Sequence, residues 1–237
     1  MNILALSSSR VGNSGYLETA APIIETFLEG HNLNIAFIPF AAVTRDFEEY
    51  GEMVKQGLPS LRHTIKVVKP ETAVADIVLS DVIMIGGGNT FKLLHTIYYL
   101  MLQDIIRDKV ANGAPYIGWS AGANITGPTI GTTNDMPIVE PKSFNALGFF
   151  PFQINPHYNN EKPVGHNGET RDERLTEFSI MNPGIPIVCL PEGTGLLRQG
   201  SELTYLGEQG VLFEGSEENK KPVKRSIAKG EDLSWLL

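Results

Sequence analysis

Short apolar runs alternate with longer helix-like stretches through the first half of the chain, and this rhythm constrains the fold more than any other feature. The runs are apolar throughout rather than at every second residue, as in parallel strands covered on both faces. Strands are expected at 2–6, 34–39, 65–68, 81–85 and 116–118, with helices at 15–28, 46–56, 72–79, 90–111 and 121–125. The pattern predicts an α/β fold with three layers, in which helices cover both faces of a mostly parallel sheet.

The pattern loosens after residue 126. A structured loop is expected over 127–151, strands at 152–155 and 186–190, and a helix at 169–181. Thr170 and Glu173 have the spacing of a capping box at the start of that helix. Short apolar runs with glycine turns follow from Leu196 and predict an antiparallel edge. No repeat or linker interrupts the chain, so a single domain over 1–237 is expected.

Composition narrows the classes of partner. Of 237 residues, 42% are hydrophobic and 19% charged, enough apolar surface for a sizeable core. The net charge of −8 disfavours nucleic acid and anionic lipid as partners. No signal peptide is visible, and no apolar run approaches the roughly 20 residues of a membrane span. Cys189 is the single cysteine, which excludes an internal disulfide and fits a reducing, cytoplasmic location.

The sharpest chemical signal is Gly118-Trp119-Ser120-Ala121-Gly122, which matches the G-x-S-x-G nucleophile elbow. An apolar run precedes it and a short helix is expected after it, which is the context that the motif requires. Small neighbours allow a sharp turn that exposes a serine hydroxyl at the end of a strand. The pattern predicts that Ser120 is a nucleophile and that the backbone N–H of Ala121 binds an oxyanion.

A second glycine turn, Gly86-Gly87-Gly88, follows the expected strand at 81–85. It matches neither dinucleotide-binding nor phosphate-binding loops, so no nucleotide cofactor is expected. Beside an elbow serine, such a turn can supply the second oxyanion N–H, and Gly87 and Gly88 are the candidates. No metal-ligand spacing is present among the histidines and carboxylates, so no metal is expected either.

A serine nucleophile needs a general base. His157 is the choice among five histidines because it follows an expected strand, on the same side of the sheet as Ser120. The others lie in connections at the opposite ends of strands, in an apolar helix, or in a polar loop: His31, His63, His95 and His166. The carboxylate that orients the base is either Glu192 or Asp135. Glu192 is favoured because it directly follows the strand at 186–190.

These motifs together resemble peptidase E, the α-aspartyl dipeptidase family of serine peptidases. The resemblance covers most of the chain, weakens after about Arg198, and rests on residues 37–41, 86–91, 118–124, 132–139, 153–157, 168–171 and 190–193. It implies a fold similar to class I glutamine amidotransferases, with serine in place of their elbow cysteine. It also implies hydrolysis of small peptides, namely dipeptides with an amino-terminal aspartate.

The resemblance assigns roles to particular residues. Ser120 matches the family's nucleophile and His157 its base, while Glu192 and Asp135 both fall in family motifs and both stay open as the third member. Arg171 matches the arginine that holds the aspartyl carboxylate, and its place in the first turn of a helix also favours an anion. Asn89 and Thr90, in the motif of the second glycine turn, are further substrate-binding candidates.

Two alternatives remain at this stage. One is a cyanophycinase-like hydrolase that cuts aspartate-linked side-chain amides, and the other is a non-catalytic binding or sensor module on the same fold. The sequence does not decide the preferred leaving residue, the closing of a loop over the substrate, or the oligomeric state, for which a homodimer is one option.

Overall fold

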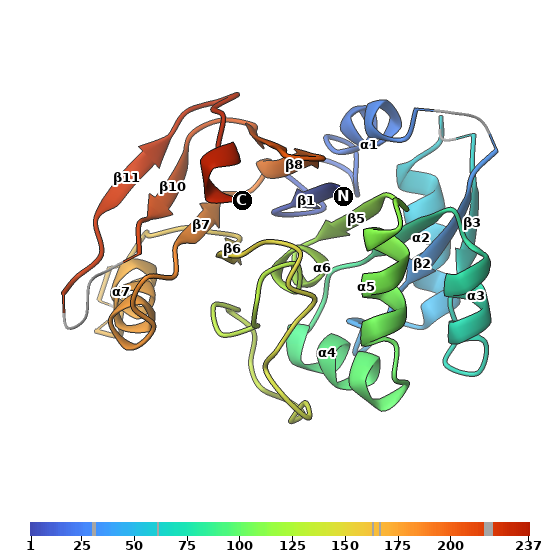
Figure 1. Ribbon diagram of the computed structural model, residues 1–237, viewed down its shortest axis with the longest axis horizontal. Coiled ribbons are helices and arrows are strands. Elements are labelled where there is room, and N and C mark those ends of the chain that lie inside the picture. The colour runs from blue at the N-terminus through green and yellow to red at the C-terminus, as the bar shows by residue number, and fades with distance from the viewer. Residues whose placement is uncertain (30–31, 61, 163, 166, 216–219) are drawn as a thin grey trace.

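The polypeptide forms two β-sheets that meet near the middle of the molecule (Figure 1). The computed structural model describes residues 1–29, 32–60, 62–162, 164–165, 167–215 and 220–237. In the larger sheet the described strands lie in the order β3-β2-β4-β5-β1-β8-β9. Their bounds are β1 Asn2–Leu6, β2 Asn34–Ile38, β3 Thr64–Val67, β4 Val82–Ile85, β5 Tyr116–Trp119, β8 Gly195–Gln199 and β9 Glu202–Leu206. The first five are parallel, and β8 pairs antiparallel with both β1 and β9.

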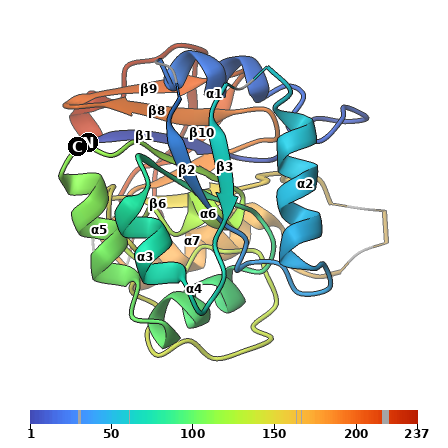
Figure 2. The same ribbon diagram turned by 90° about the vertical axis from the view of Figure 1, so that its right-hand side faces the viewer.

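Helices cover both faces of this sheet (Figure 2). One face packs against α1 (Ala21–Phe27) and α2 (Phe47–Gly57). The other packs against α3 (Ala73–Leu79), α4 (Thr90–Tyr99), α5 (Gln103–Ala111) and α6 (Ala121–Asn124). On β1, Leu4 and Leu6 pack on the face covered by α1 and α2, and Ile3 and Ala5 pack on the opposite face. Burial on both faces is why the strands are apolar throughout rather than alternating.

The smaller sheet was not expected from the sequence. Its described strands lie in the order β11-β10-β7-β6, with bounds β6 Gln153–Pro156, β7 Ile187–Leu190, β10 Gly210–Phe213 and β11 Lys224–Ile227. β7 pairs parallel with β6 and antiparallel with β10, so these strands do not extend the larger sheet. The helix α7 (Arg171–Met181) packs on it through Leu175. A 3₁₀ turn at Ser234–Leu236 ends the chain. The single domain over 1–237 stays a prediction.

Two expected helices differ from those observed, and positive φ angles explain both. The stretch 15–28 is helical only from Ala21, because the positive φ of Leu17, 57°, is incompatible with a helix. Pro22 suits the first turn, since a backbone N–H at that position would have no partner within the helix. The stretch 90–111 is two helices, because Met101 has φ 55°. The break lets Leu102 enter the core while Met101 stays 81% exposed.

The helix that carries Arg171 begins as its sequence predicts. The Thr170 hydroxyl accepts from the N–H of Glu173, and the Glu173 carboxylate accepts from the N–H of Thr170 at 2.7 Å. This capping box is confirmed, and such a cap stabilises a helix by about 1 kcal/mol. It sets Arg171 in the first turn of α7. Within the described parts of the chain, every helix is too short or too polar to cross a bilayer.

Candidate active site

The turn between β5 and α6 has the geometry that the elbow motif predicts. Ser120 has φ 55° and ψ −113°, a conformation that costs a residue with a Cβ atom about 1–3 kcal/mol. The flanking glycines are needed for close packing: a Cβ on Gly118 would lie 2.4 Å from the carbonyl oxygen of Gly122, and one on Gly122 would lie 2.3 Å from that of Ile85. The turn therefore holds Ser120 at the carboxyl end of β5 in a single, strained orientation.

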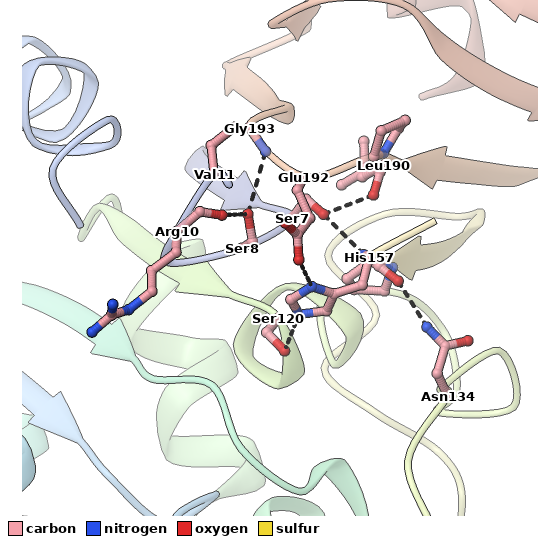
Figure 3. A network of polar contacts seen from close by, with 12 residues as sticks. Ser7, Ser8, Arg10, Val11, Ser120, Asn134, His157, Leu190, Glu192 and Gly193 are labelled. Atoms are coloured by element: carbon pink, nitrogen blue, oxygen red, sulfur yellow. Dashed lines mark hydrogen bonds and ion pairs between the residues drawn. The ribbon is translucent and has the colours of Figure 1, made fainter. Parts of the chain in front are cut away.

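Three side chains form a hydrogen-bonded line at this turn (Figure 3). His157 Nε2 lies 2.9 Å from Ser120 Oγ, and His157 Nδ1 lies 3.2 Å from Glu192 Oε1. The side chains of His157 and Glu192 are 42% and 52% exposed, so the line opens to the surface. This geometry can move a proton from Ser120 to His157 while Glu192 holds the ring in the tautomer that leaves Nε2 free.

The backbone of His157 is anchored by Ser7, which follows β1. The Ser7 hydroxyl accepts from the N–H of His157 at 2.9 Å and donates to the carbonyl of Leu190 at 2.7 Å (Figure 3). His157 has φ 51°, a strained conformation that these contacts maintain. The fully buried Ser7 thus links the larger sheet to the ends of β6 and β7.

Asp135 is hydrogen-bonded to α4 rather than to His157. Its Oδ2 atom accepts from the backbone N–H of Thr90 at 2.7 Å and from the Thr90 hydroxyl at 2.6 Å. Asp135 therefore ties the 127–151 loop to the first turn of α4, and among the described contacts none joins it to the histidine. Of the two candidate acids, the structure brings Glu192 to the base.

The glycine turn after β4 lies directly against Ser120. A Cβ on Gly87 would be 3.0 Å from the Cβ of Ser120. Gly88 has φ 139°, and a Cβ there would meet the carbonyl oxygen of Ala41 at 2.3 Å, so only glycine fits. The Gly87 carbonyl accepts from the Tyr50 hydroxyl at 3.0 Å. Because C=O and N–H point in opposite directions across a trans peptide, the N–H of Gly88 points away from Tyr50.

Arg171 reaches the same site from α7. Its Nη1 atom lies 3.4 Å from the side-chain oxygen of Asn155, and burial lowers the pKa of its guanidinium, with Arg174 adding to the effect. The neighbouring acids are engaged elsewhere: Asp172 contacts Tyr158 and Lys224, while Glu173 caps the helix. In the part of the chain that the structure describes, no carboxylate pairs with Arg171. A half-buried, unpaired guanidinium is a binding group for an anion.

Two cavities meet at Ser120 and His157. One, of about 230 Å³, is lined by Arg171, Thr90 and Asp135 together with the serine and histidine. The other, of about 370 Å³, is lined by Gly87, Gly88, Asn89, Arg45 and Tyr50 among others. Of the two further binding candidates, Thr90 is engaged by Asp135, while Asn89 caps α4 and donates to the carbonyl of Met136. Both therefore shape the cavities through contacts within the protein.

The other titratable candidates lie outside this site. His63 accepts from the backbone N–H of Leu33, and His95 contacts the carbonyl of Glu140. Cys189 is buried, and its burial raises the pKa of the thiol well above the usual value. His31 and His166 lie outside the described residues. No three His, Cys, Asp or Glu side chains gather as a metal site within the described ranges.

Sequence reasoning missed the residues that support the site. Ser7 and Asn155 are both fully buried, and Asn155 links Arg171 to the side chain of Asn134 at 2.9 Å. A weak signal was available, because Ser7 directly follows β1 and Asn155 lies within the motif that leads to His157. Polar residues at the carboxyl ends of strands are frequent site residues in α/β folds.

Comparison with known proteins agrees with this geometry. Residues 3–206 match the model of peptidase family S51. Peptidase E of Shewanella amazonensis is 48% identical over 243 aligned positions that cover all of both chains. Peptidase E of Shewanella denitrificans is 47% identical and covers all of this chain and 99% of the relative.

Two crystal structures share the fold. One, assigned to peptidase E of Listeria monocytogenes, has a TM-score of 0.67 at 25% identity and covers 86% of this chain and 96% of that one. The other, a peptidase of an acI-B1 actinobacterium, has a TM-score of 0.66 at 17% identity and covers 98% and 96%. The predicted α/β architecture, similar to class I glutamine amidotransferases, is confirmed. The chain belongs to peptidase family S51.

Proposed function

We propose that the chain is a serine dipeptidase that removes aspartate from the amino end of dipeptides through an acyl-enzyme on Ser120. One observation carries the proposal: Ser120 and His157 line the cavity that also holds the guanidinium of Arg171, with which no carboxylate of the described residues pairs. The names of the relatives support a peptidase and favour neither a cyanophycinase-like hydrolase nor a non-catalytic module.

Acylation follows from the distances. His157 Nε2 takes the proton of Ser120 Oγ, 2.9 Å away, as that oxygen attacks the carbonyl carbon of the substrate's aspartate. The carbonyl oxygen becomes an oxyanion, which the backbone N–H groups of Gly88 and Ala121 bind. The imidazolium is stabilised by Glu192 through Nδ1. When the tetrahedral intermediate collapses, the C–N bond breaks and His157 gives its proton to the leaving amine.

Deacylation follows the same steps, with a water molecule in place of the Ser120 hydroxyl. His157 takes a proton from water, whose oxygen attacks the ester carbonyl, and the same N–H groups bind the second oxyanion. The ester bond to Ser120 breaks, His157 returns the proton to Oγ, and free aspartate leaves. Neither step needs a cofactor beyond the side chains named.

Selectivity for aspartate over asparagine rests on Arg171. The guanidinium is half-buried, so a carboxylate in that cavity forms a charge-assisted pair with little competition from water. Asparagine has nearly the same shape but no charge, so it leaves the guanidinium unpaired. Such sites reject the uncharged analogue by much more than a difference in apolar contact provides.

Steady-state hydrolysis of a substrate panel tests the proposal. We expect kcat/KM to be highest for Asp-Leu, with Asn-Leu, Glu-Leu and isoaspartyl-Leu each at least about a hundredfold lower. A preference for isoaspartyl-Leu would instead indicate a side-chain amide hydrolase. Absence of hydrolysis together with absence of fluorophosphonate labelling at Ser120 would indicate a binding module. A cytoplasmic location belongs to the same proposal and agrees with the free, buried Cys189.

A further inference from the structure

A chain of hydrogen bonds leads from the residue before Ser120 to the glycine turn that faces it. Trp119 Nε1 donates to the Tyr16 hydroxyl at 3.1 Å, Tyr16 donates to the Tyr50 hydroxyl at 3.1 Å, and Tyr50 donates to the carbonyl of Gly87 at 3.0 Å. None of these groups is assigned a role by the elbow motif or by the line of three side chains. These three hydrogen bonds connect β5, the strand that leads to Ser120, with the turn after β4.

The groups at the two ends of this series determine which atom donates in each of its hydrogen bonds. An indole N–H can only donate and a carbonyl can only accept, so both tyrosine protons must point toward Gly87. Burial raises the pKa of both tyrosines above the usual value, so both stay protonated over the physiological range. Tyr50 therefore presents a permanent donor to one atom, the Gly87 carbonyl oxygen.

The rings hold that donor in place. Tyr50 is 4% exposed and packs edge-to-face on Phe37, with ring centroids 5.0 Å apart, and Phe37 stacks on Trp119 at 6.0 Å. The tyrosine reaches its acceptor only because residue 86 is glycine, since a Cβ on Gly86 would lie 2.6 Å from the Tyr50 hydroxyl oxygen. Both the absence of a side chain at 86 and the aromatic packing thus serve a single hydrogen bond.

The peptide that accepts this bond is the one that needs an external constraint. A peptide between two glycines rotates more easily than any other, because neither side carries a Cβ to restrict it. Rotation of the Gly87–Gly88 peptide would turn the N–H of Gly88 away from the oxyanion and put a carbonyl oxygen in its place. The Tyr50 bond opposes that rotation, because rotation would leave the buried proton of the Tyr50 hydroxyl without its acceptor.

We propose that Tyr50 is a positioning residue, whose hydroxyl holds the Gly87–Gly88 peptide in the orientation that directs the Gly88 N–H at the oxyanion, with Tyr16 and Trp119 aligning Tyr50. The inference rests on the proposed function of Ser120 for its catalytic readout. Because Tyr50 acts on a donor that is used only once the oxyanion forms, it contributes to the transition state rather than to the binding of the substrate.

The test is Tyr50→Phe, which removes the hydroxyl and keeps the ring. Loss of a whole oxyanion donor costs about 10²–10³ in kcat, and here the donor remains but loses its orientation, so kcat for Asp-Leu should fall by about ten- to a hundredfold. KM and the affinity for the product aspartate should stay within about twofold of wild type. The affinity for an aspartyl boronic acid, which becomes a tetrahedral anion on Ser120, should fall by the same factor as kcat.

Tyr98→Phe is the matched control, since the Tyr98 hydroxyl donates to the carbonyl of Asn145 at 3.0 Å, away from the site. It should change neither kcat nor boronate affinity. Tyr16→Phe, which removes a proton donor one step further away, should lower kcat by a smaller factor than Tyr50→Phe. It also serves as the test if Tyr50→Phe melts far below the control.

Two results would overturn the inference. One is a Tyr50→Phe enzyme whose kcat and boronate affinity match those of Tyr98→Phe, and the other is an equal loss of affinity for boronate and aspartate, which indicates a merely structural role. If wild-type enzyme does not cleave Asp-Leu, the proposed function fails separately. Tyr50→Phe should then lower the rate at which a fluorophosphonate modifies Ser120, because negative charge develops on the phosphoryl oxygen as Ser120 displaces fluoride; an unchanged rate would overturn the role of Tyr50.

Discussion

The Ser7 hydroxyl accepts a hydrogen bond of 2.9 Å from the backbone N–H of His157, a residue 150 positions later in the chain. The same hydroxyl donates to the carbonyl of Leu190, two residues before Glu192. One buried side chain therefore sets the relative position of the segments that carry the base and its carboxylate. This contact explains how a histidine at the end of the smaller sheet meets a serine at the end of the larger one.

Removal of that hydroxyl should affect both stability and turnover. In Ser7→Ala the buried N–H of His157 loses its partner, so the free energy of unfolding should fall by about 1–3 kcal/mol. The base also loses its anchor, and kcat should fall by about ten- to a hundredfold. Ser80→Ala is the control, because Ser80 is buried and donates to the carbonyl of Ile77 far from the site. Urea unfolding should show lower stability in both variants, whereas kcat should fall only in Ser7→Ala.

Substitution of the serine at the elbow separates chemistry from backbone strain. Ser120→Ala should lower kcat by about 10⁴–10⁶-fold and leave the fold intact. Ser120→Gly should be equally inactive but more stable than Ser120→Ala by about 1 kcal/mol, because glycine adopts φ 55° without strain. Thermal unfolding of both variants tests the second statement. Near wild-type turnover in Ser120→Ala would remove Ser120 from the mechanism.

Substitution of the two candidate acids should lower kcat to very different extents. Glu192→Gln weakens the contact with His157 Nδ1, so kcat should fall by about 10²–10⁴-fold, with the lower part of that range reflecting the 52% exposure of the carboxylate. Asp135→Asn keeps an oxygen that can accept from the N–H of Thr90, so kcat should change by less than about tenfold. Measurement of kcat for the two folded variants tests this ranking. A larger loss of kcat in Asp135→Asn than in Glu192→Gln would make Asp135 the acid that orients His157.

Arg171 should control the choice between aspartate and asparagine. A charge-assisted bond contributes about 1.5–3 kcal/mol, so Arg171→Met should lower kcat/KM for Asp-Leu by roughly ten- to a hundredfold or more. Asn-Leu should lose less, so the ratio between the substrates narrows. Arg171→Lys should restore activity only in part, because an ammonium group does not match a carboxylate as a planar fork does. An unchanged Asp/Asn ratio in Arg171→Met would place the aspartyl site elsewhere.

Acid stability should depend on Asp76, far from the site. Burial raises the pKa of this carboxyl, but hydrogen bonds from Lys66 at 2.5 Å and Thr72 at 2.6 Å outweigh burial and leave the pKa below its usual value. Its contribution to stability is therefore present above the unfolded-state pKa of about 3.9 and is lost as the pH falls through the lower folded-state pKa.

Asp76→Asn should accordingly be less stable than wild type at pH 7, and the difference should shrink at acid pH. Asp104→Asn is the control, because the Asp104 side chain is 88% exposed and contacts only Arg107 across 3.6 Å among the described residues. Unfolding free energies at pH 7 and pH 3 measure both. A difference from wild type that is the same at both pH values would show that the charge of Asp76 contributes nothing.

Much of this protein was readable from its sequence. The apolar strands, the elbow around Ser120 and the capping box before Arg171 are local features, because each depends on residues within a few positions of one another. Such local rules also selected His157 and favoured Glu192, both of which directly follow a strand.

Tertiary structure decided the rest. The separation of β6, β7, β10 and β11 into a second sheet depends on pairings between distant segments, which no local pattern encodes. The break at Met101 depends on whether Leu102 finds a place in the core. The contacts of Ser7 with His157 and of Tyr50 with Gly87 join segments 150 and 37 positions apart. The sequence thus determined which residues could react, and long-range packing determined which of them meet and in what orientation.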